Sequence, residues 1–392
     1  MLSRKKLAVV VIATSALIAS SSPAFAATLD GSGASFASPL IDACKVDFAK
    51  DTGHTINYNA AGSGTGRTNF TNNVGAFAGS DTPYTSAEPA GIIYAPIYAA
   101  PVAVMYNLPT IKESIYLSPA TIAQIFSGYI TNWDDKLIAA DNERTVKTVT
   151  FKTKKVTVKV KGKNTTKTVP VLDKAGKPVI ASTSEKVVNI DLPKLPITVW
   201  YRTDSSGTSG VFTAFLQGAN AGANERLWPK ASNNTFASAT PNNISTFFNF
   251  QGGAQSVGVA NGVVSKVGSI GYGELSFATD NKLGIAYVQN AAGEFTKPDA
   301  AGTSSFLGGG TINANGTVTV DFKKSIPGAY PLGTTSYALA YSSGKDATTQ
   351  KLVADWFTYV LDKCPGKYPE KGFAQITGPL YDKAKSQIAK IK

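Results

Sequence analysis

The chain has 392 residues, of which 43% are hydrophobic and 10% aromatic. This composition predicts a folded protein with a hydrophobic core and excludes a chain that is disordered throughout. The length is sufficient for two domains. The formal net charge of +12 is unevenly distributed, because the first 26 residues carry +3 and residues 144–186 carry +10. The basic charge therefore belongs to one segment, and it says little about the partners of the main body.

The first 26 residues have the pattern of a secretory signal peptide. The basic start Arg4-Lys5-Lys6 precedes an apolar run, Leu7 to Ala19, and an Ala24-Phe25-Ala26 cleavage signal. The apolar run is too short for an ordinary spanning helix, and no later segment is long enough. We expect an exported, soluble mature protein that begins near Ala27, in the periplasm or the extracellular or cell-surface space. Because no cysteine follows the cleavage signal, we expect no lipid anchor there.

The mature chain opens with a strand that runs into a turn of small residues ending in Ser35-Phe36. Ser38-Pro39 has the pattern of the cap and first residue of a helix, which Gly53 would end. A second strand runs into the glycine-rich turn at 62–66, where Ser63 lies, and a short helix is expected from about residue 67 to 73. A third strand ends at Asp81. Since ligands in open α/β sheets bind outside the carboxyl ends of strands, these polar side chains could converge.

Residues 97–107 are predicted to form an apolar strand, and Ser118-Pro119 to cap another helix. The lysine-rich segment 145–190 alternates apolar and polar residues and is predicted to be a β-hairpin or meander of two or three strands, with a bulge at Lys154-Lys155. Lysines on exposed strands prevent edge-to-edge association, which we favour over docking on an anionic surface polymer or nucleic acid. Residues 290–316 are rich in small and polar residues and are predicted to be loop. A helix is expected over 347–362.

The stretch from Arg202 to Thr208 follows the β-rich run 197–201 and precedes an apolar helical pattern. This order predicts a strand, a tight turn and a helix, whose first amides lack intrahelical partners and favour an anion. Ser206, Gly207 and Thr208 would offer hydroxyl and amide groups, Arg202 a guanidinium for an oxyanion, and Asp204 a carboxylate that holds it. The simpler alternative is an ordinary serine-capped helix with Arg202 on the surface.

Enzyme chemistry has little support in the sequence. His54 is the single histidine, and neither Ser63 nor Ser206 lies in a G-x-S-x-G elbow, so a serine nucleophile lacks a base. Two cysteines and one histidine offer no catalytic-metal spacing, and we expect no metal or cofactor. Cys44 and Cys364 could form a disulfide in an exported chain, or remain two buried thiols.

A binding site for a small tetrahedral oxyanion agrees better with these residues. Asp81 would repel a fully deprotonated anion but accept a hydrogen bond from one that retains a proton. Phosphate retains a proton at neutral pH and sulfate does not. Because an unpaired buried charge costs several kcal/mol, sulfate would be rejected strongly.

The sequence resembles the phosphate-binding proteins that serve ABC phosphate importers (PstS type). The resemblance rests on an ordered set of motifs that covers most of the mature chain except about 145–190 and parts of 230–330. The motifs are Gly31-Ser32-Gly33-Ala34-Ser35-Phe36-Ala37-Ser38-Pro39, Asn57-Tyr58 to Gly62-Ser63-Gly64, Gly79-Ser80-Asp81-Thr82-Pro83, Pro101-Val102-Ala103 to Asn107-Leu108-Pro109, Ile125-Phe126-Ser127-Gly128 to Trp133-Asp134, Arg202 to Thr208, and Gly268-Ser269-Ile270-Gly271-Tyr272.

The resemblance implies an α/β, two-lobed periplasmic-binding-protein fold (type II), with two domains joined by a hinge and phosphate between them. The first lobe would be 27–100 plus 332–392 and the second 101–331, so both cysteines would share a lobe, which supports the disulfide. Partners would be inorganic phosphate and a membrane ABC permease, and the protein would be a monomer that binds no nucleic acid. The implied phosphate ligands are Ser35, the Phe36 amide, Ser63, Asp81, Arg202, Ser206, Gly207 and Thr208, with Asp204 orienting Arg202.

Two positions depart from the family pattern. Ser35 replaces a frequent threonine, which keeps the hydroxyl, and the usual Gly-Gly-Lys-Gly-Asn run after Trp-Pro is absent after Trp228-Pro229. Gln251-Gly252-Gly253 resembles that run in part. The basic segment is an insertion relative to the common pattern. The alternative functions are an exported binder of another oxyanion or an organophosphate, and a phosphatase-like or adhesion relative on the same fold.

Overall fold

The structure is a computed structural model that describes residues 26–160 and 163–392. The predicted signal peptide therefore lies outside the described residues, apart from Ala26. In the described part of the chain, no helix combines the length and the apolar character needed to cross a membrane.

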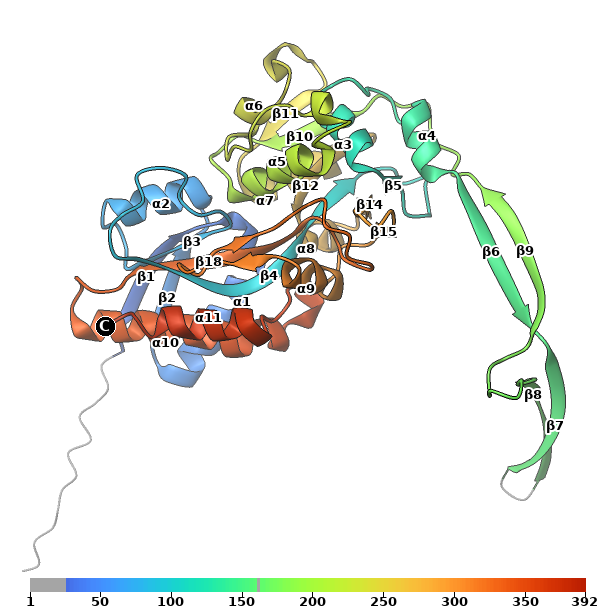
Figure 1. The fold of residues 1–392 in the computed structure, drawn as a ribbon. Helices are drawn as coiled ribbons and strands as arrows, with labels where there is room; N and C mark the ends of the chain where they lie inside the picture. Colours follow the sequence, from blue (N-terminus) through green and yellow to red (C-terminus); the bar gives the residue numbers. More distant parts are fainter. Residues whose placement is uncertain (1–25, 161–162) are drawn as a thin grey trace, which may run out of the picture.

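The main strands form one continuous curled sheet that runs through two α/β lobes (Figure 1). Its order is β11-β10-β12-β4-β18-β3-β1-β2, with β13 paired to β4 as well. The first lobe contains β1–β3 and most of β18, and the second contains β10–β13. The strands are β1 (Thr28–Gly33), β2 (Thr55–Asn59), β3 (Phe77–Ser80), β4 (Ile92–Tyr106), β10 (Thr198–Arg202), β11 (Phe250–Gly253), β12 (Ser269–Glu274), β13 (Gly284–Ile285) and β18 (Gly333–Tyr341).

Strand β4 belongs to both lobes. Its first part, Ile92 to Pro101, pairs with β18, and its last part, from Val102, pairs with β12. A second crossing runs beside it, because Val102 N donates to Leu332 O at 2.9 Å and Tyr330 Oη donates to Val102 O at 2.7 Å. Two adjacent extended segments thus connect the lobes, which is the arrangement that permits a hinge.

Helices cover both faces of the sheet. In Figure 1, α10 and α11 lie under the first lobe, and α5 and α7 flank the strands of the second. The helices are α1 (Ser38–Thr52), α2 (Ser63–Thr71), α3 (Pro119–Phe126), α4 (Lys136–Asn142), α5 (Gly207–Asn220), α6 (Phe236–Ala239), α7 (Gln255–Ser265), α8 (Leu275–Asp280), α9 (Ala300–Gly308), α10 (Ala347–Lys367) and α11 (Gly378–Ile388). The short strands are β5 (Tyr116–Leu117), β14 (Tyr287–Gln289), β15 (Phe295–Thr296), β16 (Thr311–Ile312) and β17 (Val318–Thr319).

The predicted start of the first helix is wrong by one residue. The chain enters α1 through a 3-10 turn, Ser35–Ala37, so Ala37 is the cap and Ser38 is the first helical residue. The Ser38 hydroxyl donates to Ser35 O at 2.9 Å. The predicted stop is confirmed, since Gly53 has the left-handed φ of 77° that ends a helix.

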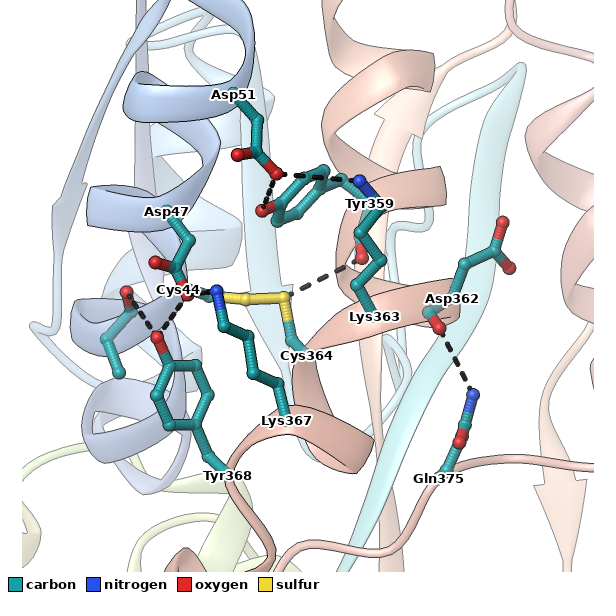
Figure 2. The surroundings of a disulfide bond; sticks show 11 residues. Cys44, Asp47, Asp51, Tyr359, Asp362, Lys363, Cys364, Lys367, Tyr368 and Gln375 are labelled. Atoms are coloured by element: carbon teal, nitrogen blue, oxygen red, sulfur yellow. Dashed lines mark hydrogen bonds and ion pairs between the residues drawn. A yellow bond between two sulfur atoms is a disulfide. The ribbon is translucent and has the colours of Figure 1, made fainter.

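A disulfide joins Cys44 of α1 to Cys364 of α10, with their Cα atoms 5.9 Å apart (Figure 2). The predicted bond is therefore present, and it closes a loop of 320 residues. Polar contacts between the same helices surround it, because Asp47 accepts from the Tyr368 hydroxyl and pairs with Lys367 Nζ. The Lys367 and Tyr368 donors together hold the pKa of Asp47 below its ordinary value.

Residues 290–316 are not all loop, contrary to the prediction. Helix α9 begins where Asp299 Oδ1 accepts from Gly302 N at 2.7 Å, and it buries Phe306 and Leu307. Its other residues are small, so no apolar periodicity marked it in the sequence. The following hairpin, β16–β17, lies against the first lobe: Val318 N donates to Tyr337 Oη at 3.0 Å. The lobe boundaries proposed from the sequence stay a prediction.

Residues 144–160 and 163–188 form a long arm that projects away from both lobes (Figure 1). The arm consists of two antiparallel ribbons, β6 (Arg144–Phe151) with β9 (Ile180–Val188) and β7 (Thr153–Val160) with β8 (Lys163–Pro170). These are four strands and not the two or three predicted. The predicted bulge at Lys154-Lys155 is wrong, because β7 pairs with β8 without interruption and the register shifts instead between Thr150 and Phe151.

Candidate functional site

The Arg202 stretch folds as the sequence predicts, with β10 followed by a turn and α5. Ser206 caps α5, since its Oγ accepts from Ser209 N at 3.1 Å. Arg202 is 2% exposed, and its Nε and Nη2 donate to the two carboxylate oxygens of Asp204 at 2.7 and 2.5 Å. Burial alone would raise the pKa of Asp204, but these bonds and one from the Gln255 amide hold it below its ordinary value. The guanidinium is thus fixed in orientation, and the alternative of a surface arginine is excluded.

Ser35 of the first lobe meets Arg202 of the second through Ser256. Ser256 N donates to Ser35 Oγ at 3.1 Å, the two hydroxyl oxygens lie 3.2 Å apart, and Arg202 Nη1 donates to Ser256 Oγ at 3.2 Å. Phe36 follows Ser35 in the 3-10 turn and is fully buried. The N–H groups at the start of such a turn lack intrahelical partners, so they are free to bind an anion.

Ser63, Asp81, Gly207 and Thr208 form the other half of the cluster. Asp81 N donates to Ser63 Oγ at 3.3 Å, and Thr208 Oγ1 donates to Asp81 Oδ2 at 3.2 Å. A Cβ on Gly207 would lie 2.5 Å from Ser63 Oγ, so this close approach of the two lobes requires glycine. Six of the predicted ligand residues therefore lie in two groups joined by close contacts where the lobes meet, and Phe36 and Ser206 adjoin them in the chain.

Asp81 is the most deeply buried acid of this interface, with 3% exposure. Burial raises its pKa, while hydrogen bonds from the hydroxyls of Ser336 and Thr208 act in the opposite direction. Ser336 Oγ donates to Asp81 Oδ1 at 2.5 Å. Asp81 has no direct ion-pair partner in the described part of the chain. The side-chain groups that donate to its carboxylate are the neutral hydroxyls of Thr208 and Ser336. A carboxylate without a positively charged partner can accept a further hydrogen bond from a ligand that carries a proton.

The lobes touch directly around this cluster, which is a closed arrangement. Gly64 N donates to Ser205 O at 2.8 Å, and the side chains of Thr82 and Asn234 contact each other at 3.1 Å. A cavity of about 590 Å³ lies alongside and reaches Asp81, but it is not lined by the other predicted ligands. Asp81 therefore separates the enclosed cluster from a larger, partly open part of the cleft.

The cluster has the chemistry of an oxyanion site. It combines serine and threonine hydroxyls, helix-start amides and one fixed guanidinium, and its single unpaired acid is Asp81. Among the described residues, no group of histidine, cysteine, aspartate and glutamate could hold a metal ion.

Comparison with known proteins assigns the family. The family model of the PBP superfamily domain matches residues 19–363. The phosphate-binding protein PstS 2 of Mycobacterium tuberculosis is 30% identical over 355 residues, with 86% of this chain and 79% of that protein covered. The chain belongs to the PstS family of phosphate-binding proteins. The phosphate-binding protein PstS of Xylella fastidiosa is 28% identical over 342 residues, covering 85% of this chain and 77% of that protein.

Solved structures show the same fold as this PstS family member. A high affinity periplasmic phosphate-binding protein bound with phosphate has a TM-score of 0.64 at 20% identity, covering 92% of this chain and 93% of that chain. A phosphate-binding protein from Stenotrophomonas maltophilia has a TM-score of 0.60 at 19% identity with the same coverage. The predicted two-lobed periplasmic-binding-protein fold is confirmed.

Three further residues contact this cluster and were not predicted from the sequence: Ser256, Ser336 and Asn234. Ser256 follows the partial match Gln251–Gly253, and it lies at the start of α7 just beyond β11, the strand next to β10. The pattern of a strand, small residues and a serine at a helix start was therefore present there too. Ser336 lies within β18 and Asn234 in a loop, where nothing local distinguishes them.

Proposed function

We propose that this protein binds inorganic phosphate between its lobes and delivers it to the membrane permease of an ABC phosphate importer. Membership of the PstS family supports both the ligand and the transport role. The proposal depends mainly on two residues in the closed interface. Arg202 supplies a positive charge that is fixed in orientation, and the buried carboxylate of Asp81 supplies a hydrogen-bond acceptor. The protein is a binding protein and not an enzyme, as the names of its curated relatives indicate.

Asp81 provides the basis for choosing phosphate over sulfate. Monohydrogen phosphate can donate its proton to the Asp81 carboxylate, while the other oxygens accept from hydroxyls, amides and Arg202. Sulfate at neutral pH has no proton, so one of its oxygens would face the carboxylate without a hydrogen bond between them. In an interface that excludes water this repulsion is weakly screened.

The proposed ligand set combines both lobes, so phosphate would stabilise the closed form. Opening would break the inter-lobe contacts of Gly64 with Ser205 and of Thr82 with Asn234, with rotation about β4 and the adjacent crossing segment. The proposed phosphate ligands are Ser35, the Phe36 amide, Ser63, Asp81, Arg202, Ser206, Gly207 and Thr208, with Asp204 orienting Arg202.

Ser256 joins this set as a proposed ligand or a positioning residue, because its hydroxyl connects Arg202 to Ser35. Its replacement by alanine should weaken phosphate binding. Replacement by threonine, which keeps the hydroxyl, should restore part of the affinity.

Isothermal titration calorimetry on the chain from Ala27, unfolded, freed of bound phosphate and refolded, tests the proposal. We expect saturable binding of one phosphate and no comparable heat from sulfate at neutral pH. Absence of phosphate binding by a chain that has refolded would refute the proposal. A turnover assay with phosphomonoesters should give no product above the buffer rate, and steady hydrolysis would favour the phosphatase-like alternative.

Export and assembly belong to the same proposal. The amino-terminal sequence supports export through a signal peptide and residence outside the cytoplasmic membrane, and we propose a monomer with the lobe boundaries given above. Deletion of residues 146–188 should leave phosphate affinity intact, because the arm projects away from the lobes (Figure 1). The sequence also suggested an anionic surface polymer as a partner for this arm.

A further inference from the structure

The arm formed by residues 144–188 is the largest feature that phosphate binding does not use. Among its described residues, the ribbons pair within themselves and with no strand of the main sheet. An isolated two-stranded ribbon is marginally stable in water, because one face of it has nothing to pack against. The arm therefore presents a surface that a partner could cover.

Exposed apolar side chains gather where the two ribbons of the arm meet. Phe151 and Ile180 are cross-strand partners, and they are 46% and 54% exposed. Leu172 is 55% exposed and bridges to Pro178, two residues before Ile180. Large apolar groups that lie exposed together are typical of interaction surfaces.

Exposed lysines surround these apolar side chains. Their positions follow from the strand register: β7 carries two adjacent lysines next to the junction, Lys167 lies on the opposite strand, β8, and the turn between β8 and β9 carries two more. Within the described part of the chain, none of these lysines forms an ion pair. The exposed lysines of the junction and the outer ribbon are Lys152, Lys154, Lys155, Lys167, Lys174 and Lys177.

We propose that the arm binds the surface of a bilayer that contains anionic phospholipids. Lysines attract the anionic headgroups, and their long aliphatic stems let the ammonium groups remain at the headgroup level while the apolar side chains enter the interface. An anionic polymer could neutralise the lysines, but it has no apolar layer to cover Phe151, Leu172 and Ile180. The combination of basic and apolar side chains therefore favours the bilayer over the polymer.

Co-flotation with lipid vesicles tests the proposal on the chain from Ala27. We expect binding to vesicles of phosphatidylcholine with about one third phosphatidylglycerol, none to pure phosphatidylcholine, and weaker binding as salt is added. No binding to the anionic vesicles would overturn the proposal and would leave the lysines as protection against edge-to-edge association.

Charge and apolar contributions are tested separately with matched variants. Replacing four arm lysines by glutamine should lower vesicle binding by about tenfold or more, and four body lysines by less than about twofold. Phe151→Ser with Ile180→Ser should lower it by about fivefold or more, whereas two exposed body valines changed to serine should not. The arm set is Lys152, Lys154, Lys155 and Lys167, the body set is Lys50, Lys230, Lys266 and Lys282, and the valines are Val46 and Val74.

Two further outcomes would contradict the proposal. Equal losses in the arm and body variants would mean that binding follows net charge and not the arm. Vesicle binding that does not respond to the Phe151 and Ile180 changes, together with equally strong binding to soluble poly(glycerol phosphate), would identify a polyanion as the partner. Phosphate titration of every variant verifies that it is folded, and this readout is independent of the arm.

Discussion

Replacement of Asp81 by asparagine tests how the site distinguishes phosphate from sulfate. The substitution keeps the size of the side chain and an oxygen that can accept from phosphate, but it removes the charge. In the parent protein, two unit charges about 3 Å apart at an effective dielectric constant near 20 would repel by about 5 kcal/mol. The positive charge of Arg202 offsets part of this, so we expect removal of the carboxylate to relieve about 3 kcal/mol, or roughly a hundredfold in sulfate affinity.

The same change should weaken phosphate binding modestly. A charge-assisted hydrogen bond to Asp81 becomes a neutral one, at a cost of about 1 kcal/mol, or roughly fivefold in affinity. The gain in sulfate affinity and the loss in phosphate affinity both lower the ratio of phosphate to sulfate affinity. We therefore expect this ratio to fall by about two to three orders of magnitude. Calorimetric titration of the parent and the variant with each anion at neutral pH measures the phosphate and the sulfate affinities.

Asp204→Asn is the matched control, because it makes the same chemical change one step away from the ligand. Asp204 pairs with Arg202 through both oxygens, so its loss should weaken phosphate and sulfate binding together and leave their ratio nearly unchanged. If Asp81→Asn rejects sulfate as well as the parent does, or if both variants alter the ratio equally, the role assigned to Asp81 is wrong.

The remaining predictions concern stability and close packing. Replacing Cys44 and Cys364 together by serine should lower the free energy of unfolding by about 3 kcal/mol in denaturant titrations, with phosphate affinity unchanged. Burial raises the pKa of Glu274 from 4.5 to about 8. The folded state thus holds a proton that the unfolded state releases, and stability should fall as pH rises from 4.5 to 8, by on the order of 4 kcal/mol from this group. Glu274→Gln should flatten this dependence. Gly207→Ala should weaken phosphate binding by about tenfold or more, because its Cβ would lie 2.5 Å from a hydroxyl oxygen. Gly308→Ala, whose Cβ would meet nothing within 4 Å, should preserve affinity.

Each of these predictions has a result that contradicts it. A serine double variant as stable as the parent would mean that the disulfide contributes nothing measurable. An unchanged pH profile in Glu274→Gln would show that other groups cause the dependence. Full phosphate affinity in Gly207→Ala would mean that the lobes do not approach this closely when phosphate is bound.

Local chemistry in the sequence determined much of the first lobe and the Arg202 stretch. The cap of α5 and the glycine that ends α1 both depend on contacts within a few residues, so the pattern is sufficient to predict them. The same local logic placed Ser35, Ser63 and Asp81 at strand ends. Its errors were local as well: α2 begins at Ser63 and not near residue 67, so the glycine-rich turn is the first turn of that helix.

The tertiary structure alone decided which distant groups meet. Ser336 lies in the middle of a strand, yet its hydroxyl contacts a carboxylate 255 residues away because β18 lies beside β3. Ser256 contacts Ser35 across 221 residues because the lobes close on each other. The sequence of helix α9 shows no apolar periodicity, and the helix is stabilised by the packing of Phe306 and Leu307 against other elements. Sequence periodicity records the neighbours along the chain, whereas these contacts depend on how two lobes and one shared sheet are assembled in space.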